Sequence, residues 1–169
     1  MTDKRESRLA NAPRRGKSCP MRFNSHMDTA LSQAAAAASR GEVPVGALIV
    51  GPDGQIIAQA GNRTRELNDP TAHAEILAIR AACAALGSER LPGCDLYVTL
   101  EPCPMCASAI SQARIGRLYY GASDPKSGGV AHGPRVFEHP QSHHVPEVYD
   151  GIGAQASEAL LKGFFQKRR

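Results

Sequence analysis

The sequence has no tryptophan and no long apolar run. Its longest apolar stretches, 34–38 and 43–50, fall far short of the roughly 20 residues that a membrane-spanning helix needs. Hydrophobic residues make up 42% of the 169 positions and charged residues 21%, which is typical of a globular domain and not of a disordered chain. A chain of this length can bury a core of its own, so we expect one domain and no membrane segment.

A paired cysteine framework is also missing. The chain has five cysteines, an odd number, and its N-terminus lacks the apolar segment of a secretory signal. We therefore do not expect a fold stabilised by disulfides. Reduced thiols are typical of the cytoplasm, which is the location that the sequence predicts.

Positive charge is scarce in the middle of the chain and gathers at its ends. Residues 1–22 hold seven basic and two acidic side chains, a balance of +5, and the remaining 13 basic and 14 acidic residues give −1. Because this segment has almost no apolar periodicity, we predict a disordered basic arm over 1–22 and a single domain over 23–169. The arm, like the basic cluster at 162–169, is either a solvated terminus or an electrostatic contact for nucleic acid.

Helical and strand patterns alternate along the domain. The alanine-rich stretch 24–40 predicts a helix, and two apolar runs around the turn GPDG predict a hairpin over 45–62. Further helices are predicted over 71–87, with Thr71 as N-cap, 104–115 and 154–168, and further strands over 94–100 and 117–122. The alternation predicts an α/β fold with helices on both faces of one sheet, whereas 135–150 gives no clear pattern.

Two predicted helix beginnings carry residues that bind metals. One is His73-Ala-Glu75, and the other is Cys103-Pro-Met-Cys106. Cysteines three apart lie on one face of a helix, and the electropositive helix N-terminus favours their thiolate forms. Taken alone, the cysteine pair fits a redox dithiol, half of a structural zinc site or part of a catalytic metal centre.

The number of available ligands favours a catalytic centre. Structural zinc sites are closed by four protein ligands, whereas catalytic sites use three and leave one position to water. The other cysteines, Cys19, Cys83 and Cys94, have no paired spacing, and we expect none of them to be a ligand. Glu75 lies two residues from the histidine, where its carboxylate can act as general base and then general acid toward such a water.

The pattern His73-Ala-Glu75 followed by Pro102-Cys103-x-x-Cys106 resembles the signature of the zinc-dependent nucleobase deaminases. The chain resembles the cytidine/deoxycytidylate deaminase superfamily. Within it, the segments EVPVGALIV, GNRTRELNDPTAHAEI, LYVTLEPCPMCASAI and RIGRLYYGASDPKSGG are similar to the bacterial tRNA-specific adenosine deaminases.

The resemblance implies a three-layer α/β/α fold with a mixed five-stranded sheet. It implies one Zn²⁺ per subunit, held by His73, Cys103 and Cys106, with Glu75 as proton shuttle. The implied reaction is hydrolytic deamination of the wobble adenosine of a tRNA anticodon to inosine, by a homodimer that binds the anticodon stem-loop. The implied substrate-binding residues are Asn62, Ala74, Asp124, His144 and Arg168.

One segment departs from the family pattern, and other functions compete. Where the family usually has Asn-His-Arg late in the chain, this sequence has His143-His144-Val145, so one asparagine and one arginine of the expected RNA surface are missing. The nearest alternative is a deaminase of a free base such as guanine or cytosine. The others are a thiol oxidoreductase that uses Cys103 and Cys106 and a nucleic-acid-binding module with structural zinc.

Overall fold

The computed structural model describes residues 26–167 and contains four α-helices and five strands in that range. In chain order the elements are α1 (His26–Ser39), β1 (Gly46–Val50), β2 (Ile56–Gly61), α2 (Ala74–Leu86), β3 (Asp95–Leu100), α3 (Pro104–Gln112), β4 (Arg117–Ala122), the short 3-10 helix η1 (Val136–Glu138), β5 (Glu147–Tyr149) and α4 (Ala154–Gln166). The predicted arm 1–22 and Arg168 lie outside the described residues.

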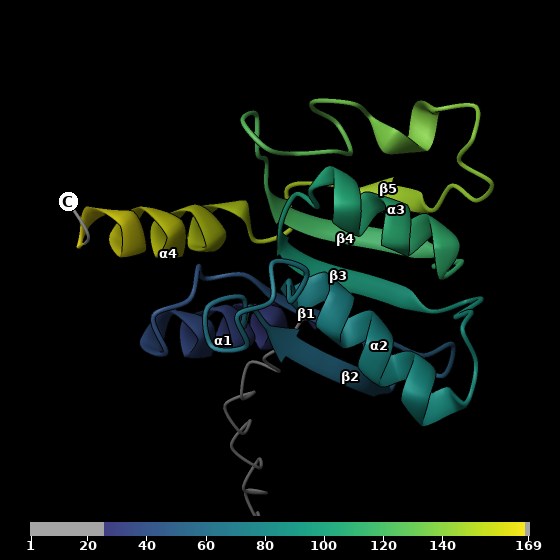
Figure 1. Ribbon diagram of the computed structural model, residues 1–169, viewed down its shortest axis with the longest axis horizontal. Coiled ribbons are helices and arrows are strands. Elements are labelled where there is room, and N and C mark those ends of the chain that lie inside the picture. The colour runs from purple at the N-terminus through teal and green to yellow at the C-terminus, as the bar shows by residue number, and fades with distance from the viewer. Residues whose placement is uncertain (1–25, 168–169) are drawn as a thin grey trace, which may run out of the picture.

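The strands form one mixed sheet in the order β2-β1-β3-β4-β5 (Figure 1). β1 is antiparallel to both β2 and β3, and β3, β4 and β5 are parallel. The parallel β3–α3–β4 unit is the predicted crossover, and it brings the start of α3 to the carboxyl end of β3. The predicted mixed five-stranded sheet is confirmed.

Side chains of β1 alternate between two helical layers. Ile49 packs in the larger core cluster with Ala78 of α2, and Leu48 packs with Met27 of α1 on the opposite face. Figure 1 shows α2 and α3 over one face and α1 behind the sheet, with α4 extending to the left beside it. α4 contacts α1 and β4. The three-layer α/β/α prediction is therefore confirmed.

α1 lies unusually close to the sheet because small residues meet there. A Cβ atom added at Gly46 would lie 2.1 Å from the carbonyl oxygen of Ala30 and 2.5 Å from the amide nitrogen of Ala34. Both alanines are fully buried. The alanine content of this helix thus sets the layer spacing on that face, because no larger side chain fits between the backbones.

Two details of the sequence prediction were wrong or incomplete. α2 begins at Ala74 with His73 as N-cap, and not at Thr71, because the amide and hydroxyl of Thr71 both donate to Asp69 Oδ1, at 2.8 and 2.7 Å. β5 falls in the segment without a predicted structure. Among the described residues, no helix is long and apolar enough to cross a bilayer.

Candidate metal centre

The N-termini of α2 and α3 meet at the carboxyl end of β3, and each provides metal-ligating side chains. His73 is the N-cap of α2 and Cys103 the N-cap of α3, where Pro104 starts the helix without needing an amide partner. His73 Nδ1 lies 3.7 Å from Cys103 Sγ and 3.5 Å from Cys106 Sγ. The three predicted ligands, thirty residues apart in the sequence, are thus brought together.

The spacing of these atoms fits a zinc ion. A tetrahedral zinc with bonds of about 2.05 Å to nitrogen and about 2.3 Å to sulfur separates the two ligand atoms by about 3.6 Å, and the structure has 3.5 and 3.7 Å. Within residues 26–167 no fourth histidine, cysteine or carboxylate joins this group. A three-ligand set leaves one tetrahedral position for a small molecule, as in catalytic zinc sites.

The protonation states of the two cysteines are coupled. A hydrogen bond from the Cys106 thiol, together with one from His73, lowers the pKa of Cys103 to about 4. Hydrogen bonding to Cys103 and burial raise the pKa of Cys106. The hydrogen bond to Cys103 also raises the pKa of His73. The site therefore holds one thiolate readily, and a bound dication is what makes a second thiolate favourable.

Glu75 lies in the first turn of α2, two residues after His73. Its side chain is almost fully enclosed, with 3% of the residue exposed, and it lines the same cavity as His73 and Cys103. Burial raises the pKa of this carboxyl group. A buried carboxyl group with a raised pKa accepts a proton more readily than an exposed one, which favours a role as general acid–base.

The cavity in front of these groups is small. It has a volume of about 210 Å³, below the roughly 300–1,000 Å³ of clefts that hold drug-sized ligands. Its walls include Asn62, His73, Glu75, Cys103, Asp124 and Ser127. The space suits one ring system of nucleobase size, placed directly against the ligand cluster.

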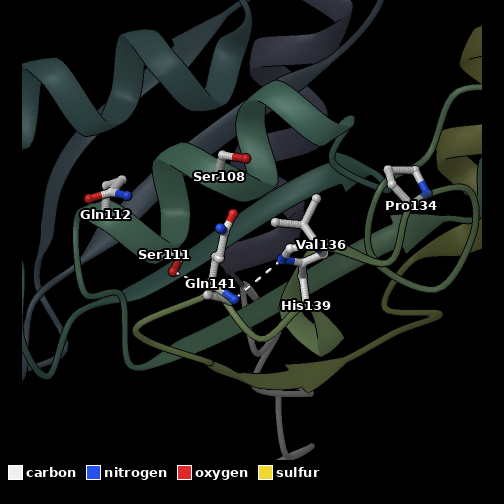
Figure 2. Close-up of a pocket in the computed structure, with 8 residues that line it drawn as sticks. Ser108, Ser111, Gln112, Pro134, Val136, His139 and Gln141 are labelled. Carbon is white, nitrogen blue, oxygen red and sulfur yellow. Dashed lines mark hydrogen bonds between the residues drawn. The ribbon is translucent and has the colours of Figure 1, made fainter.

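A larger cavity lies on the outer side of α3. It has a volume of about 300 Å³ and is lined by residues of α3 and of the segment 134–142, as Figure 2 shows. Its surface is polar, with Ser111, Gln112 and Gln141 in the lining. His139 is the one residue in this lining of a type that commonly binds metals. The smaller cavity is therefore the candidate active site, because predicted ligands and the buried carboxyl group meet there.

The comparison with known families agrees with this geometry. Residues 22–122 match the family model of the cytidine and deoxycytidylate deaminase zinc-binding region. The chain belongs to this deaminase family. The predicted zinc-dependent enzyme class is thereby confirmed, and the three clustered side chains are positioned to hold a metal ion.

Known relatives of the deaminase include tRNA-modifying enzymes. It is 61% identical over 143 residues to a tRNA-specific adenosine deaminase of Agrobacterium fabrum, and the alignment covers 85% of this chain and 93% of the relative. A solved structure from a study of A-to-I editing by tRNA:A34 deaminases superposes with a TM-score of 0.78 at 62% identity, covering 80% of this chain and 97% of that one. Guanine deaminase from Bacillus subtilis superposes with a TM-score of 0.57 at 34% identity, covering 84% and 90%.

Two of the predicted substrate-binding residues line the deaminase cavity. Asn62 is buried there, and its Oδ1 accepts the amide N–H of Ala74 at 2.8 Å, which fixes the orientation of the Asn62 side chain. The Ala74 amide is thus already engaged within the protein. Asp124 also lines the cavity, and its Oδ1 accepts the amides of Lys126 and Ser127.

His144 is not among the residues that line this cavity. His144 lies at the far end of α3, where its Nε2 donates to the carbonyl oxygen of Ile115 at 2.6 Å. Arg168 is outside the described residues. Sequence reasoning missed Glu101 and Ser127, which both line the cavity. For Glu101 a signal was present, because a charged residue follows the apolar strand directly and precedes the cysteine motif.

Proposed function

We propose that this deaminase hydrolyses the wobble adenosine of a tRNA anticodon to inosine and ammonia. The observation that carries the proposal is the cluster of His73, Cys103 and Cys106 beside the buried Glu75 in a cavity of base size. The relatives named for tRNA adenosine deamination are 61% and 62% identical to this chain, which supports this substrate over others.

The chemistry follows from the residues that surround the cavity. Zinc held by the three ligands would supply Lewis acidity, which makes water a nucleophile near neutral pH. Glu75 takes one proton from the attacking water and delivers it to the ring nitrogen next to the amine-bearing carbon. It then takes the second proton from the newly formed hydroxyl group and delivers it to the amino group, which leaves as ammonia. The carbon–oxygen bond forms and the carbon–nitrogen bond breaks, so one water is consumed and one ammonia released.

The base has to enter the cavity alone. An adenosine inside a duplex is stacked and paired, whereas one in a single-stranded anticodon loop is extruded at lower cost. We assign the walls of the cavity, with Asn62 and Asp124, to orientation of the flipped base. Ala74, His144 and Arg168 stay predictions as substrate contacts.

We also assign the basic C-terminus to RNA binding. Lys162 and Lys167 are exposed on and beyond α4, and Arg168 extends the same cluster in the sequence. Side chains of this kind neutralise backbone phosphates, which gives affinity without base specificity. We propose the anticodon stem-loop as partner, a homodimer as the working assembly and the cytoplasm as the location.

Two alternatives predict different substrates. A guanine deaminase would act on the free base, and the Bacillus subtilis guanine deaminase shares the fold at a lower TM-score of 0.57. A thiol oxidoreductase would use Cys103 and Cys106 alone and would have no need of His73 at 3.5–3.7 Å from both sulfur atoms or of Glu75.

A substrate panel separates these functions. The purified protein is incubated with a tRNA that carries a wobble adenosine, with the same tRNA carrying a wobble guanosine, and with free adenosine, guanine and cytosine. We expect inosine from the first substrate alone. Deamination of the free base or nucleoside without reaction of the tRNA would overturn the proposal.

A further inference from the structure

Glu101 is a buried carboxylate that the proposed reaction does not use. It follows β3 directly and precedes Pro102 and the ligand Cys103 in the sequence, and its side chain is fully enclosed, at 0% exposed. Five donors of one loop point at its two oxygens. Oε2 accepts from the Asp124 amide at 2.9 Å and pairs with His132 Nδ1 at 2.7 Å, and Oε1 accepts from the amides of Val130 at 3.2 Å, Ala131 at 2.9 Å and His132 at 3.0 Å.

The loop 124–132 closes tightly around this carboxylate. A Cβ atom at Gly128 would lie 2.5 Å from both Cδ and Oε1 of Glu101, so only glycine permits this approach. The next residue, Gly129, donates its amide to the carbonyl oxygen of Pro102 at 2.8 Å. The loop is thereby attached to the segment that carries the first zinc-binding cysteine.

The same loop forms one wall of the deaminase cavity. Asp124 and Ser127 line the cavity, and both lie on the part of the loop that begins at the Glu101 contacts. The Asp124 side chain is held in turn by amides within the loop, so it moves with the loop as a unit. The position of this wall relative to Glu75 therefore depends on the Glu101 carboxylate.

A charged carboxylate is needed for this number of contacts. Both oxygens of Glu101 accept hydrogen bonds, Oε2 from the Asp124 amide and His132 and Oε1 from three loop amides, so neither oxygen is left to carry a proton. Hydrogen bonds to an ionised acceptor are stronger than those between neutral groups. A glutamine at this position has one acceptor oxygen, and its NH₂ group would face N–H donors that it cannot satisfy.

We propose that Glu101 is a positioning residue that sets the wall of the base cavity by holding the loop 124–132, with His132 as the side-chain partner that closes the loop. The proposal rests on the proposed function, because it assigns this wall to orientation of the flipped base. Glu101 acts through Asp124 and Ser127 and does not itself exchange protons with the substrate.

The test compares Glu101→Gln with Asp95→Asn. Asp95 is a matched control, since it is a buried carboxylate at the other end of β3, where it pairs with Arg117 at 2.7 Å. Both zinc-loaded variants are measured for zinc content, for kcat and KM on the tRNA substrate, and for hydrogen exchange of the backbone amides. The exchange measurement needs no substrate, so failure of the tRNA assignment leaves it interpretable.

For Glu101→Gln we expect faster exchange at the amides of 124 and 130–132 and unchanged exchange in α2. We expect kcat/KM to fall about tenfold or more, mainly through KM, with about one zinc per chain retained. Asp95→Asn should change kcat/KM less than about twofold. Unchanged loop exchange, an equal loss in both variants, or a loss that only follows missing zinc would each overturn the proposal.

A milder pair of variants covers the case in which Glu101→Gln does not fold. His132→Ala removes one of the five contacts, and His132→Asn restores an N–H donor on a shorter side chain. We expect kcat/KM to fall in His132→Ala and to recover at least partly in His132→Asn, with the loop exchange rates following the same order. The proposal is contradicted if the loop amides of His132→Ala exchange faster than those of the wild type while kcat/KM is the same in both. The position of the loop would then not matter to the reaction.

Discussion

Replacing Glu75 with glutamine separates catalysis from metal binding. Glutamine keeps the volume and hydrogen-bonding shape of the side chain but cannot carry a proton between water and base. Glu75 is 3% exposed and is not a member of the ligand cluster, so the change should leave the zinc site assembled. The deaminase should therefore bind zinc and tRNA but react slowly.

The size of the loss follows from the role of the group. A positioned general acid–base typically contributes 10²–10⁴-fold to the rate, which corresponds to about 2.7–5.5 kcal/mol of activation free energy. Burial raises the pKa of Glu75, so ionising this group at neutral pH lowers the stability of the metal-free folded protein. Glutamine carries no charge and avoids this loss. The metal-free Glu75→Gln protein should therefore melt at a higher temperature than the wild type at neutral pH.

The assay is single-turnover inosine formation, with zinc measured on the same samples. The matched control is Glu89→Gln, which makes the same chemical change at a side chain that is 83% exposed. We expect the control to match the wild type in zinc content and rate. A Glu75→Gln enzyme that lost its zinc, or that kept a rate within about tenfold of wild type, would refute the assigned role.

Further substitutions test the metal centre, the packing and the electrostatics. Cys106→Ala removes one of three ligands, so metal analysis should find far less than one zinc per chain, whereas Cys83→Ala should keep the wild-type content. Gly46→Ala places a Cβ 2.1 Å from the α1 backbone and should lower the free energy of unfolding, measured by urea denaturation, by about 1–3 kcal/mol. Gly163 lies in α4 with open space around it, so Gly163→Ala should raise the free energy of unfolding by up to about 1 kcal/mol. Burial raises the pKa of Tyr120 to about 12, so above about pH 10 the folded state keeps a proton that the unfolded state loses. The free energy of unfolding should therefore fall as pH rises above about 10. It should fall less steeply in Tyr120→Phe.

The metal centre could be predicted from the sequence because its residues lie in two short motifs. A helix begins at each motif, His73-Ala-Glu75 and Cys103-Pro-Met-Cys106. The periodicity of an α-helix then determines which of their side chains share a face. The layered α/β fold was likewise predictable, since helices and strands alternate along the chain. The exact start of α2 was not, because the Thr71 side chain bonds to Asp69 and leaves His73 as N-cap.

The rest of the site depends on contacts that no local pattern encodes. β5 has three residues, all exposed, so it has no apolar alternation that could reveal it. The wall formed by Asp124 and Ser127 depends on Glu101, more than twenty residues away in the sequence, and a buried carboxylate with five donors cannot be inferred from a motif. His144 was assigned by analogy, and its ring contacts the Ile115 carbonyl instead of lining the cavity.

The central claim is that the zinc centre and Glu75 hydrolyse an adenosine of tRNA at the wobble position. The most direct measurement is the reaction of zinc-loaded protein with a wobble-adenosine tRNA in ¹⁸O-labelled water, followed by mass spectrometry of the anticodon fragment. We predict inosine at the wobble position alone, with one ¹⁸O in the base and one ammonia released for each inosine. An anticodon that stays adenosine, or inosine without the label, would contradict the account.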